Sequence, residues 1–321
     1  MMQDAIKGFA KQFAFTPVVA NGPVPRKPHT IVLGMGGSHL AADILAAWQP
    51  ERSLTIHSDY GLPPLPPSVL KDSLVIASSY SGNTEEVLDG FAKAQQQGLA
   101  VAALAVGGKL LELANQNNVP YVQLPDTGIQ PRSALGFSLL ALLKLMGNEE
   151  GLQEAAKLSQ TLKPEKLEPE GRALAEQFRG KVPVIYASTP NRAIAYNWKI
   201  KLNETGKIPA FMNVIPELNH NEMNGFDARD ASRELSRQFA FIFLRDRNDH
   251  SRNQKRFEVV RQQYENRGFP VTILELKGKT PLEKIFRSLL VADWFAVHTA
   301  ESYGLESEQV PMIEEFKQLI G

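Results

Sequence analysis

Hydrophobic and polar positions follow two patterns that alternate along the chain. Short runs that are apolar at nearly every position indicate strands buried on both faces, and longer runs with apolar residues three and four apart indicate helices. This alternation predicts the α/β class, with doubly wound parallel sheets covered by helices on both faces. The expected strands are residues 29–33, 54–57, 73–78, 100–106, 121–124, 182–187, 239–244 and 270–276, and the expected helices are residues 39–48, 84–98, 110–117, 132–146, 192–205, 251–267, 281–303 and 311–320.

The chain length predicts two domains, because 321 residues is long for one hydrophobic core. Residues 148–180 have helix-type composition, mixed charge and no strand signal, so we expect a helical linker there. The predicted organisation is an α/β domain over residues 1–147, this linker, and a second α/β domain over residues 181–321 that ends in a short amphipathic helix. Strand-to-turn junctions at residues 77–79 and 187–189 occupy similar places in the two halves, which indicates duplication.

Composition and charge exclude several classes of protein. Lysine and arginine together number 35, as do aspartate and glutamate, so no global basic field attracts nucleic acid or anionic lipid. The absence of cysteine excludes disulfides, thiolate nucleophiles and cysteine-ligated metal centres, and it favours a reducing compartment. No apolar run approaches the ~18 residues of a membrane helix, and residues 1–13 lack the apolar core of a signal peptide. We therefore expect a cytoplasmic enzyme with neither nucleic-acid nor membrane partners.

A glycine-rich turn follows the first predicted strand. Residues 34–38 (Gly-Met-Gly-Gly-Ser) lie between this strand and a helix, where bare backbone N–H groups and the helix dipole favour an anion. We interpret the turn as a cradle for a phosphate or a substrate. Two alternatives stay open. The first is a dinucleotide-binding site in which Asp59 binds the ribose, although His39 occupies the position where that motif needs a third glycine. The second is a tight turn that binds no ligand.

A second turn, residues 78–84, carries four serine and threonine hydroxyls between a strand and a helix. Hydroxyls together with the amides of a helix N-terminus can bind a phosphate monoester without lysine or arginine. The alternative is that Thr84 merely caps the following helix. A cap needs one hydroxyl, however, and leaves Ser78, Ser79 and Ser81 unexplained, so we favour a phosphate site.

A family resemblance becomes visible at this second turn. Residues 78–85 closely resemble the phosphosugar-binding loop of the sugar isomerase (SIS) domain. Four further segments are similar to the bifunctional phosphoglucose/phosphomannose isomerase family: residues 131–134 (PRSA), 198–207 (WKIKLNETGK), 217–223 (ELNHNEM) and 313–317 (IEEFK). The resemblance spans residues 34–317. It implies two SIS domains that interconvert glucose 6-phosphate and mannose 6-phosphate with fructose 6-phosphate through an enediolate.

The resemblance also implies roles for individual residues. Glu204 is the base, Arg132 faces the reacting carbons, and His220 and Lys317 assist opening of the sugar ring. The residues implied to bind the substrate phosphate are Ser79, Ser81 and Thr84, with Gly36, Gly37 and Ser38 beside them. Related isomerases receive the histidine from the second subunit, so a homodimer that shares His220 across its interface is implied. Neither a metal nor an organic cofactor is expected.

Without the family, the same residues still fit aldose–ketose chemistry. Moving a proton between adjacent carbons through an enediolate needs one positioned carboxylate and one cation beside the developing oxyanion. Glu204 at a helix end and Arg132 at a helix start both oppose the local helix dipole, which favours a functional role. A metal shared by His220 and Glu222 is the weaker alternative, because a spacing of two in a loop is a poor ligand arrangement.

Lys317 lies on the predicted terminal helix. Ile313, Phe316 and Ile320 share one face of this helix, and we expect that face to dock on the body of the protein with Lys317 bordering a cleft. Two rival functions are a sugar-phosphate sensor without turnover and a nicotinamide-dependent enzyme. Residues 303–310 do not align with the family, so the preference between glucose and mannose stays open.

Overall fold

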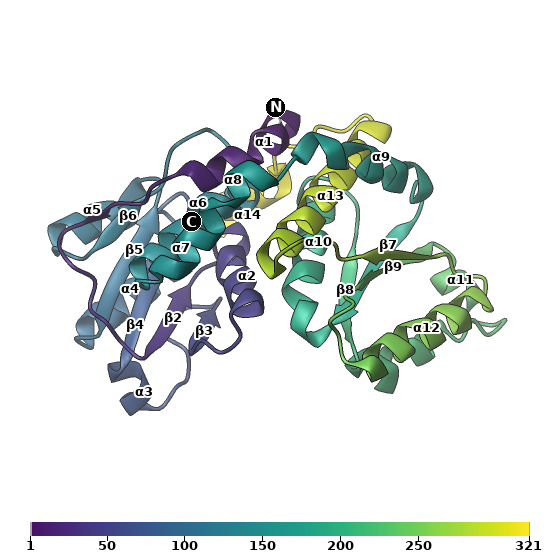
Figure 1. Ribbon diagram of the computed structural model, residues 1–321, viewed down its shortest axis with the longest axis horizontal. Helices are drawn as coiled ribbons and strands as arrows, with labels where there is room; N and C mark the ends of the chain where they lie inside the picture. The colour runs from purple at the N-terminus through teal and green to yellow at the C-terminus, as the bar shows by residue number, and fades with distance from the viewer. Residues whose placement is uncertain (1, 321) are drawn as a thin grey trace. The chain divides into compact units, whose positions relative to one another are not determined.

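Each predicted strand is present, and the strands form two sheets in two separate units (Figure 1). The computed structural model describes residues 2–320. Residues 8–162 form the N-terminal unit, and residues 2–7 together with 163–320 form the C-terminal unit. The predicted α/β class with parallel sheets is therefore confirmed.

Six strands build the sheet of the N-terminal unit. They are β1 (Val19–Ala20), β2 (His29–Leu33), β3 (Leu54–His57), β4 (Ser73–Ser78), β5 (Ala100–Ala105) and β6 (Tyr121–Gln123). Their order is β1-β6-β5-β4-β2-β3, with β1 antiparallel to β6 and the other neighbours parallel. The central strand β4 is buried at every position, which explains why its sequence is an almost continuous apolar run.

Helices cover both faces of this sheet. They are α2 (Leu40–Trp48), α3 (Pro67–Lys71), α4 (Glu85–Gln96), α5 (Gly108–Gln116), α6 (Leu135–Leu145), α7 (Glu149–Ala156) and α8 (Leu158–Thr161), with 3₁₀ turns η1 (Phe9–Ala14), η2 (Gly36–Ser38) and η3 (Pro131–Ser133). Strand β2 leads to β3 on one side and β4 leads to β5 on the other, so right-handed crossovers place α2 and α4 on opposite faces. Val87, Phe91 and Leu110 of α4 and α5 pack onto the sheet core.

Four parallel strands build the sheet of the C-terminal unit. They are β7 (Val182–Ser188), β8 (Phe211–Ile215), β9 (Phe239–Arg245) and β10 (Val271–Glu275), in the order β10-β9-β7-β8. Its helices are α1 (Met2–Lys7), α9 (Glu168–Gln177), α10 (Arg192–Glu204), α11 (Arg233–Ser236), α12 (Ser251–Glu265), α13 (Pro281–Ser302) and α14 (Pro311–Ile320), with 3₁₀ turns η4 (Pro164–Leu167), η5 (Thr189–Asn191), η6 (Glu217–His220) and η7 (Glu222–Phe226). Strand β8 has no counterpart among the predicted strands.

The two units repeat one topology. The order β10-β9-β7-β8 matches the order β5-β4-β2-β3 of the N-terminal unit, so β7 corresponds to β2 and β9 to β4. The duplication inferred from residues 77–79 and 187–189 rests on the wrong pair of junctions. Residues 77–79 follow β4, whereas residues 187–189 follow β7, the counterpart of β2. The true counterpart of the hydroxyl loop is the segment that follows β9.

Packing divides the chain differently from the predicted boundaries. Helix α1 belongs to the C-terminal unit because Met2 and Ile6 are buried there and Gln3 donates to Glu301 of α13 (2.6 Å). The segment expected as a linker, residues 148–180, is helical but split: α7 and α8 pack in the N-terminal unit, while η4 and α9 pack in the C-terminal one. Gly171 of α9 lets that helix lie directly on α13, where a Cβ would come within 2.3 Å of Trp294.

Candidate active site

The first candidate feature is a crevice at the carboxyl edge of the N-terminal sheet. Strands β2 and β4 are neighbours, yet the chain leaves them toward opposite sides of the sheet. Parallel sheets bind ligands at such a switch point, outside the carboxyl ends of the two strands. Residues 34–38 follow β2 and residues 78–84 follow β4, so both predicted turns lie at the switch point. We call these two segments together the cradle.

Ser38 joins the two halves of the cradle. Its hydroxyl oxygen accepts from the backbone N–H of Tyr80 (2.9 Å), and its carbonyl oxygen accepts from the hydroxyl of Ser78 (2.7 Å). Ser38 and Ser78 are buried, so water does not compete strongly for these bonds. The glycine turn and the hydroxyl loop therefore form one connected structure.

Ser79 and Thr84 brace the loop from within. Their hydroxyls lie 2.8 Å apart in a hydrogen bond, and the Ser79 hydroxyl also accepts from the backbone N–H of Gly82 (3.1 Å). Thr84 precedes α4, but its side chain makes no capping hydrogen bond to that helix. The simple N-cap interpretation of Thr84 therefore does not hold, and the first backbone N–H groups of α4 point toward the cradle.

Glycine is required at the turn of the hydroxyl loop. Gly82 has φ +76°, and a Cβ there would lie 1.8 Å from the carbonyl oxygen of Gly107. The close approach fixes the loop against the start of α5 and turns Ser81 outward, where it is exposed. Ser81 is thus the hydroxyl of the loop that is most open to a ligand.

Arg132 lies beside the glycine half of the cradle. It is 1% exposed, and a Cβ on Gly37 would come within 2.8 Å of its backbone nitrogen. The side chain of Gln12 fixes this segment, because its amide donates to the carbonyl of Ser133 (2.6 Å) and accepts from the N–H of Gly136 (2.9 Å). The backbone of Arg132 thus lies at the switch point, and its side chain is a buried cation, a kind of group that stabilises negative charge strongly because little water screens it.

Replacing both Ser81 and Thr84 by alanine should weaken the binding of a sugar phosphate by about 10²-fold or more, because a hydrogen bond to a charged group contributes about 1.5–3 kcal/mol. Calorimetry with glucose 6-phosphate measures this loss of affinity. Ser68→Ala, an exposed serine in the same unit, is the matched control. Unchanged substrate affinity in the double variant would move the phosphate site elsewhere.

Glu204 lies in the C-terminal unit, at the last residue of α10, and is half-buried. One turn earlier, Lys201 is fully buried and donates from Nζ to Oδ1 of Asp293 on α13 (2.6 Å). This buried ion pair holds the last turn of α10 on α13, and with it the position of Glu204. Sequence reasoning missed Lys201, although a lysine on the apolar stripe of a helix is a signal for a buried ion pair.

Lys207 connects the end of α10 to the C-terminal arm. It adopts the left-handed conformation (φ 58°), and its Nζ donates to the carbonyl oxygen of Glu204 (2.7 Å). The same ammonium donates to the carbonyl oxygen of Gln309, two residues before α14. Glu204 and the connection to α14 are therefore neighbours within the C-terminal unit.

His220 lies in η6, at the end of a loop that follows β8, and its side chain is exposed. Within residues 2–320 its imidazole has no hydrogen-bond partner. It lines a groove of about 660 Å³ together with Met223, Tyr264 and Arg267. An accessible imidazole with both ring nitrogens available suits a proton shuttle.

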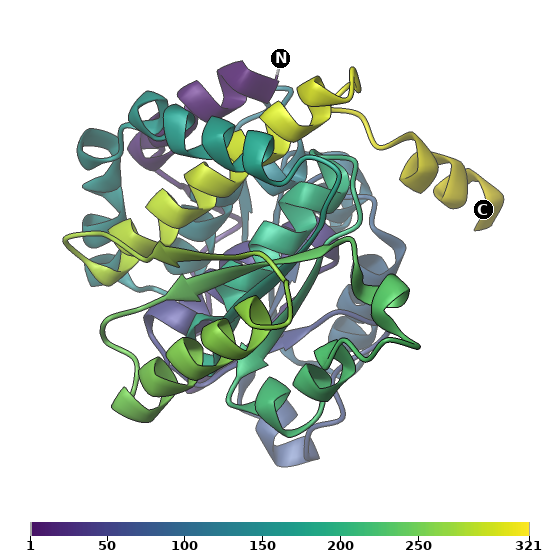
Figure 2. The same ribbon diagram turned by 90° about the vertical axis from the view of Figure 1, so that its right-hand side faces the viewer.

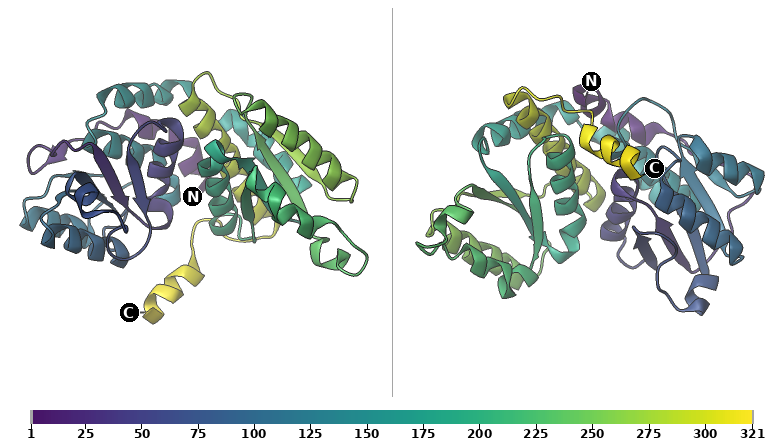
Figure 3. Two further views of the ribbon diagram at one scale, coloured as in Figure 1. Left: turned by 90° about the horizontal axis from the view of Figure 1, so that it is seen from below. Right: turned by 180° about the vertical axis from the view of Figure 1, so that it is seen from behind.

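Helix α14 corrects one expectation. Its apolar face was expected to dock on the body, yet α14 has no buried residue, and Phe316 and Leu319 are 59% and 78% exposed. Figures 2 and 3 show the helix at the end of an extended connection, standing off from the rest of its unit. The spacing of apolar residues determines which face of the helix is apolar, but it does not determine which part of the protein, if any, that face contacts. Lys317 donates to Glu314 of the same helix (2.7 Å).

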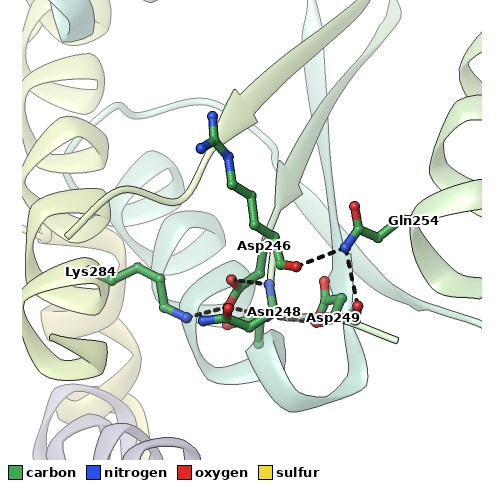
Figure 4. Close-up of polar contacts among 8 residues, drawn as sticks. Asp246, Asn248, Asp249, Gln254 and Lys284 are labelled. Carbon is green, nitrogen blue, oxygen red and sulfur yellow. Dashed lines mark hydrogen bonds and ion pairs between the residues drawn. The ribbon is translucent and has the colours of Figure 1, made fainter. Parts of the chain in front are cut away.

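The C-terminal unit has its own switch point between β7 and β9, and charged side chains fill it (Figure 4). Asp246 is buried and accepts from the ammonium of Lys284 on α13 and from the N–H of Asn248 (3.0 Å). Asp249 accepts from the hydroxyl of Ser188 at the end of β7 (2.6 Å). Two carboxylates repel a phosphate dianion. The switch points of the two units therefore differ in charge, and the cradle of the N-terminal unit is the better phosphate site.

Asp249→Asn should stabilise the protein at neutral pH. Burial raises the pKa of Asp249 above its usual range, and the nearby Asp246 raises it further. A carboxyl with a raised folded-state pKa stabilises the fold below its unfolded pKa, and this contribution is lost as the pH rises through the folded pKa. The Tm gain of the variant should thus be largest near about pH 8 and vanish near about pH 4. Asp230→Asn, at a fully exposed carboxyl, is the control; equal Tm values for Asp249→Asn and wild type at every pH would contradict the assignment.

Comparisons with known proteins agree with this geometry. Residues 168–320 match the family described as the bacterial phospho-glucose isomerase C-terminal SIS domain. A bifunctional phosphoglucose/phosphomannose isomerase of Aquifex aeolicus is 33% identical over 317 residues, which cover 98% of this chain and 96% of that protein. The chain belongs to the bifunctional phosphoglucose/phosphomannose isomerase family. The resemblance drawn from the five sequence segments is confirmed, and neither the sensor nor the nicotinamide alternative is favoured.

One further relative and one solved structure are similar to this chain. A D-glucosamine-6-phosphate 4-epimerase of Sulfolobus acidocaldarius is 30% identical over 207 residues, which cover 62% of this chain and 64% of that protein. The C-terminal domain of glucosamine-fructose-6-phosphate aminotransferase from Francisella tularensis shares the fold, with TM-score 0.68 at 14% identity over 96% of each chain. Within residues 2–320, no group of three histidine, aspartate or glutamate side chains is placed to hold a metal, and no helix has the length and apolarity to cross a bilayer.

The structure thus sorts the predicted site residues into two sets. Seven belong to the N-terminal unit and lie together at its switch point: Gly36, Gly37, Ser38, Ser79, Ser81, Thr84 and Arg132. The other three, Glu204, His220 and Lys317, belong to the C-terminal unit. The roles of all ten stay predictions.

Proposed function

We propose that this member of the family interconverts glucose 6-phosphate and mannose 6-phosphate with fructose 6-phosphate, as an aldose–ketose isomerase. The observation that carries the proposal is the pairing of a hydroxyl cradle with the buried Arg132 at one switch point, in a chain of this family. The cradle suits a phosphate monoester, and the guanidinium suits an oxyanion.

The proposed reaction needs one base and one cation. Glu204 removes the proton from C2 of the open-chain aldose, and the electrons of that bond form a C1–C2 double bond as the C1 oxygen becomes negative. Arg132 stabilises the enediolate oxygens. The proton of the C2 hydroxyl then passes to the negative C1 oxygen, Glu204 returns its proton to C1, and the C2 oxygen becomes the carbonyl of the ketose.

The same intermediate accounts for two substrates. Glucose 6-phosphate and mannose 6-phosphate differ only in configuration at C2, and the planar enediolate erases that difference. A single site with one mobile proton at Glu204 can therefore serve both epimers, provided that the cradle lets the carbon chain rotate about its fixed phosphate.

Ring opening is the role proposed for His220 and Lys317. Lys317→Ala should lower kcat on the ring-closed sugars by about 10²-fold, the usual contribution of a group that transfers or assists a proton. Folding should be unaffected, because the side chain is 61% exposed and an exposed ion pair is worth at most about 1 kcal/mol. Glu314→Ala removes the same ion pair and is the matched control. Equal loss of activity with an open-chain analogue would rule out a ring-opening role.

We also propose a homodimer in which His220 of one subunit completes the site of the other. Its exposed imidazole, without a partner in its own unit, supports this arrangement. Mixing inactive Glu204→Gln and His220→Ala subunits should then restore activity, because one site of each mixed dimer holds both native residues. No recovery in confirmed mixed dimers would contradict a shared site. The substrates are phosphate dianions that do not cross bilayers, so we propose that the enzyme works in the cytoplasm.

A coupled assay tests the function directly. Purified protein is given glucose 6-phosphate or mannose 6-phosphate, and fructose 6-phosphate is measured. We expect product from both sugars. Failure with both, together with 4-epimerisation of glucosamine 6-phosphate, would instead align the chain with its epimerase relative.

A further inference from the structure

Glu222 lies two residues after His220, and its carboxylate is fully engaged by the protein. The hydroxyl of Tyr186 on β7 donates to Oε1 (2.5 Å), and the side-chain amide of Asn213 on β8 donates to Oε2 (2.5 Å). Both oxygens thus have protein donors, and they come from two neighbouring strands of the sheet. This arrangement argues against the metal shared with His220 that the sequence left open.

Tyr186 is held in turn by a second phenol. It is fully buried, and its hydroxyl lies 3.3 Å from that of Tyr264 on α12. Because Tyr186 gives its only proton to Glu222, its oxygen accepts from Tyr264. Burial raises the pKa of both phenols, that of Tyr264 to about 12, so both remain protonated donors at any working pH. The two phenols therefore keep their protons for these hydrogen bonds.

Other residues next to His220 are fixed as well. Asn219 accepts from the guanidinium of Arg256 on α12 (3.2 Å). Asn221 donates to Glu217 (2.7 Å) and accepts from the backbone N–H of Glu222 (2.6 Å). The imidazole of His220 lies between these anchors and has no hydrogen-bond partner within residues 2–320.

Apolar packing holds this segment mainly at its two ends. Leu218 is buried, and the ring of Phe226 packs edge-on against Phe241 and Phe269. Residues 219–225 between them contribute no buried side chain, so polar anchors decide where these residues lie. Glu222 is the polar anchor that joins this stretch to the sheet.

We propose that Glu222, together with Tyr186 and Asn213, is a positioning residue that holds the His220 segment in register while leaving the imidazole free for the sugar ring. This inference rests on the proposed role of His220. It assigns to the Glu222 carboxylate the task of fixing a catalytic group that it does not itself touch.

Exchanging the two partners of the Asn213–Glu222 bond tests the proposal. In Glu222→Gln, the new side-chain NH₂ group faces the NH₂ group of Asn213. Two donors cannot bond to each other, so residues 217–226 lose this anchor to the sheet. We expect kcat on ring-closed sugars to fall by about 10–10²-fold, the cost of misplacing a catalytic group by about 1 Å. Adding Asn213→Asp places a carboxylate opposite that amide, so the double variant should recover most of the loss. Turnover of an open-chain analogue should be unchanged throughout.

Hydrogen exchange of residues 217–226 separates this inference from the function it rests on. We expect faster exchange in Glu222→Gln and Tyr186→Phe, and native exchange in the double variant. If His220→Ala is fully active while exchange follows this pattern, the role of His220 fails and the anchor stands. Unchanged exchange and kcat in Glu222→Gln, or a double variant no better than the single one, would overturn the proposal.

Discussion

Replacing Glu204 by glutamine is expected to lower kcat by about 10²–10⁴-fold, the contribution of a positioned general base, while hexose 6-phosphates still bind. Glutamine keeps the shape of the side chain but cannot take the proton from C2. The fold should be unaffected, because Lys201 and Asp293 hold the end of α10 and the Lys207 ammonium binds the backbone carbonyl of Glu204, which the substitution leaves in place. Kinetics and calorimetry on the same preparation separate turnover from binding.

The matched control for this substitution is Glu265→Gln. Glu265 is the last residue of α12, just as Glu204 is the last residue of α10, so both variants remove a negative charge from a helix C-terminus. Only the Glu204 variant should lose activity. Near-normal turnover in Glu204→Gln would show that another group takes the proton.

The second large effect is expected at Arg132. Arg132→Met should reduce kcat by about 10²–10³-fold, as removal of one oxyanion-stabilising donor does in other enzymes. Phosphate binding should largely survive, since the cradle is built from Ser38, Ser79 and Thr84 through their own hydrogen bonds. The readout is kcat against KM for both hexose phosphates.

Arg132→Lys is the informative companion variant. Lysine keeps the positive charge but not the planar fork of donors, so it should recover part of the loss only. Because Arg132 is 1% exposed, a thermal melt must show that each variant is folded. If folded Arg132→Met keeps full kcat, the guanidinium does not face the enediolate.

Helices and strands could be predicted where their burial produces a local pattern of apolar residues in the sequence. Strand β4 is buried at every position, so its apolar run marks it in the sequence. Strand β8 lacks this signal, because it lies at the sheet edge, starts with the exposed Phe211 and carries Asn213 in its centre. The unit boundaries depend on contacts between distant segments, such as Gln3 with Glu301, and local composition does not encode these.

The site divides in the same way. The cradle could be predicted because its hydroxyls and glycines lie within two short loops at strand ends. Residues that are close in the sequence of such a loop are also close in space. The anchors of the proposed catalytic groups could not, since Lys201 contacts Asp293 and Tyr186 contacts Glu222 only after the sheets and helices pack. The apolar face of α14 was predictable as a face, but its surroundings were not.

Incubation of fructose 6-phosphate with the protein in D₂O tests the central claim most directly. Because the proton on Glu204 exchanges with solvent during the life of the enediolate, the account predicts both glucose 6-phosphate and mannose 6-phosphate, each with deuterium at C2. Nuclear magnetic resonance identifies both products and the labelled carbon, and Glu204→Gln should form neither. Products without deuterium at C2 would contradict a proton on Glu204 that exchanges with solvent, and formation of only one of the two aldoses would contradict a shared intermediate.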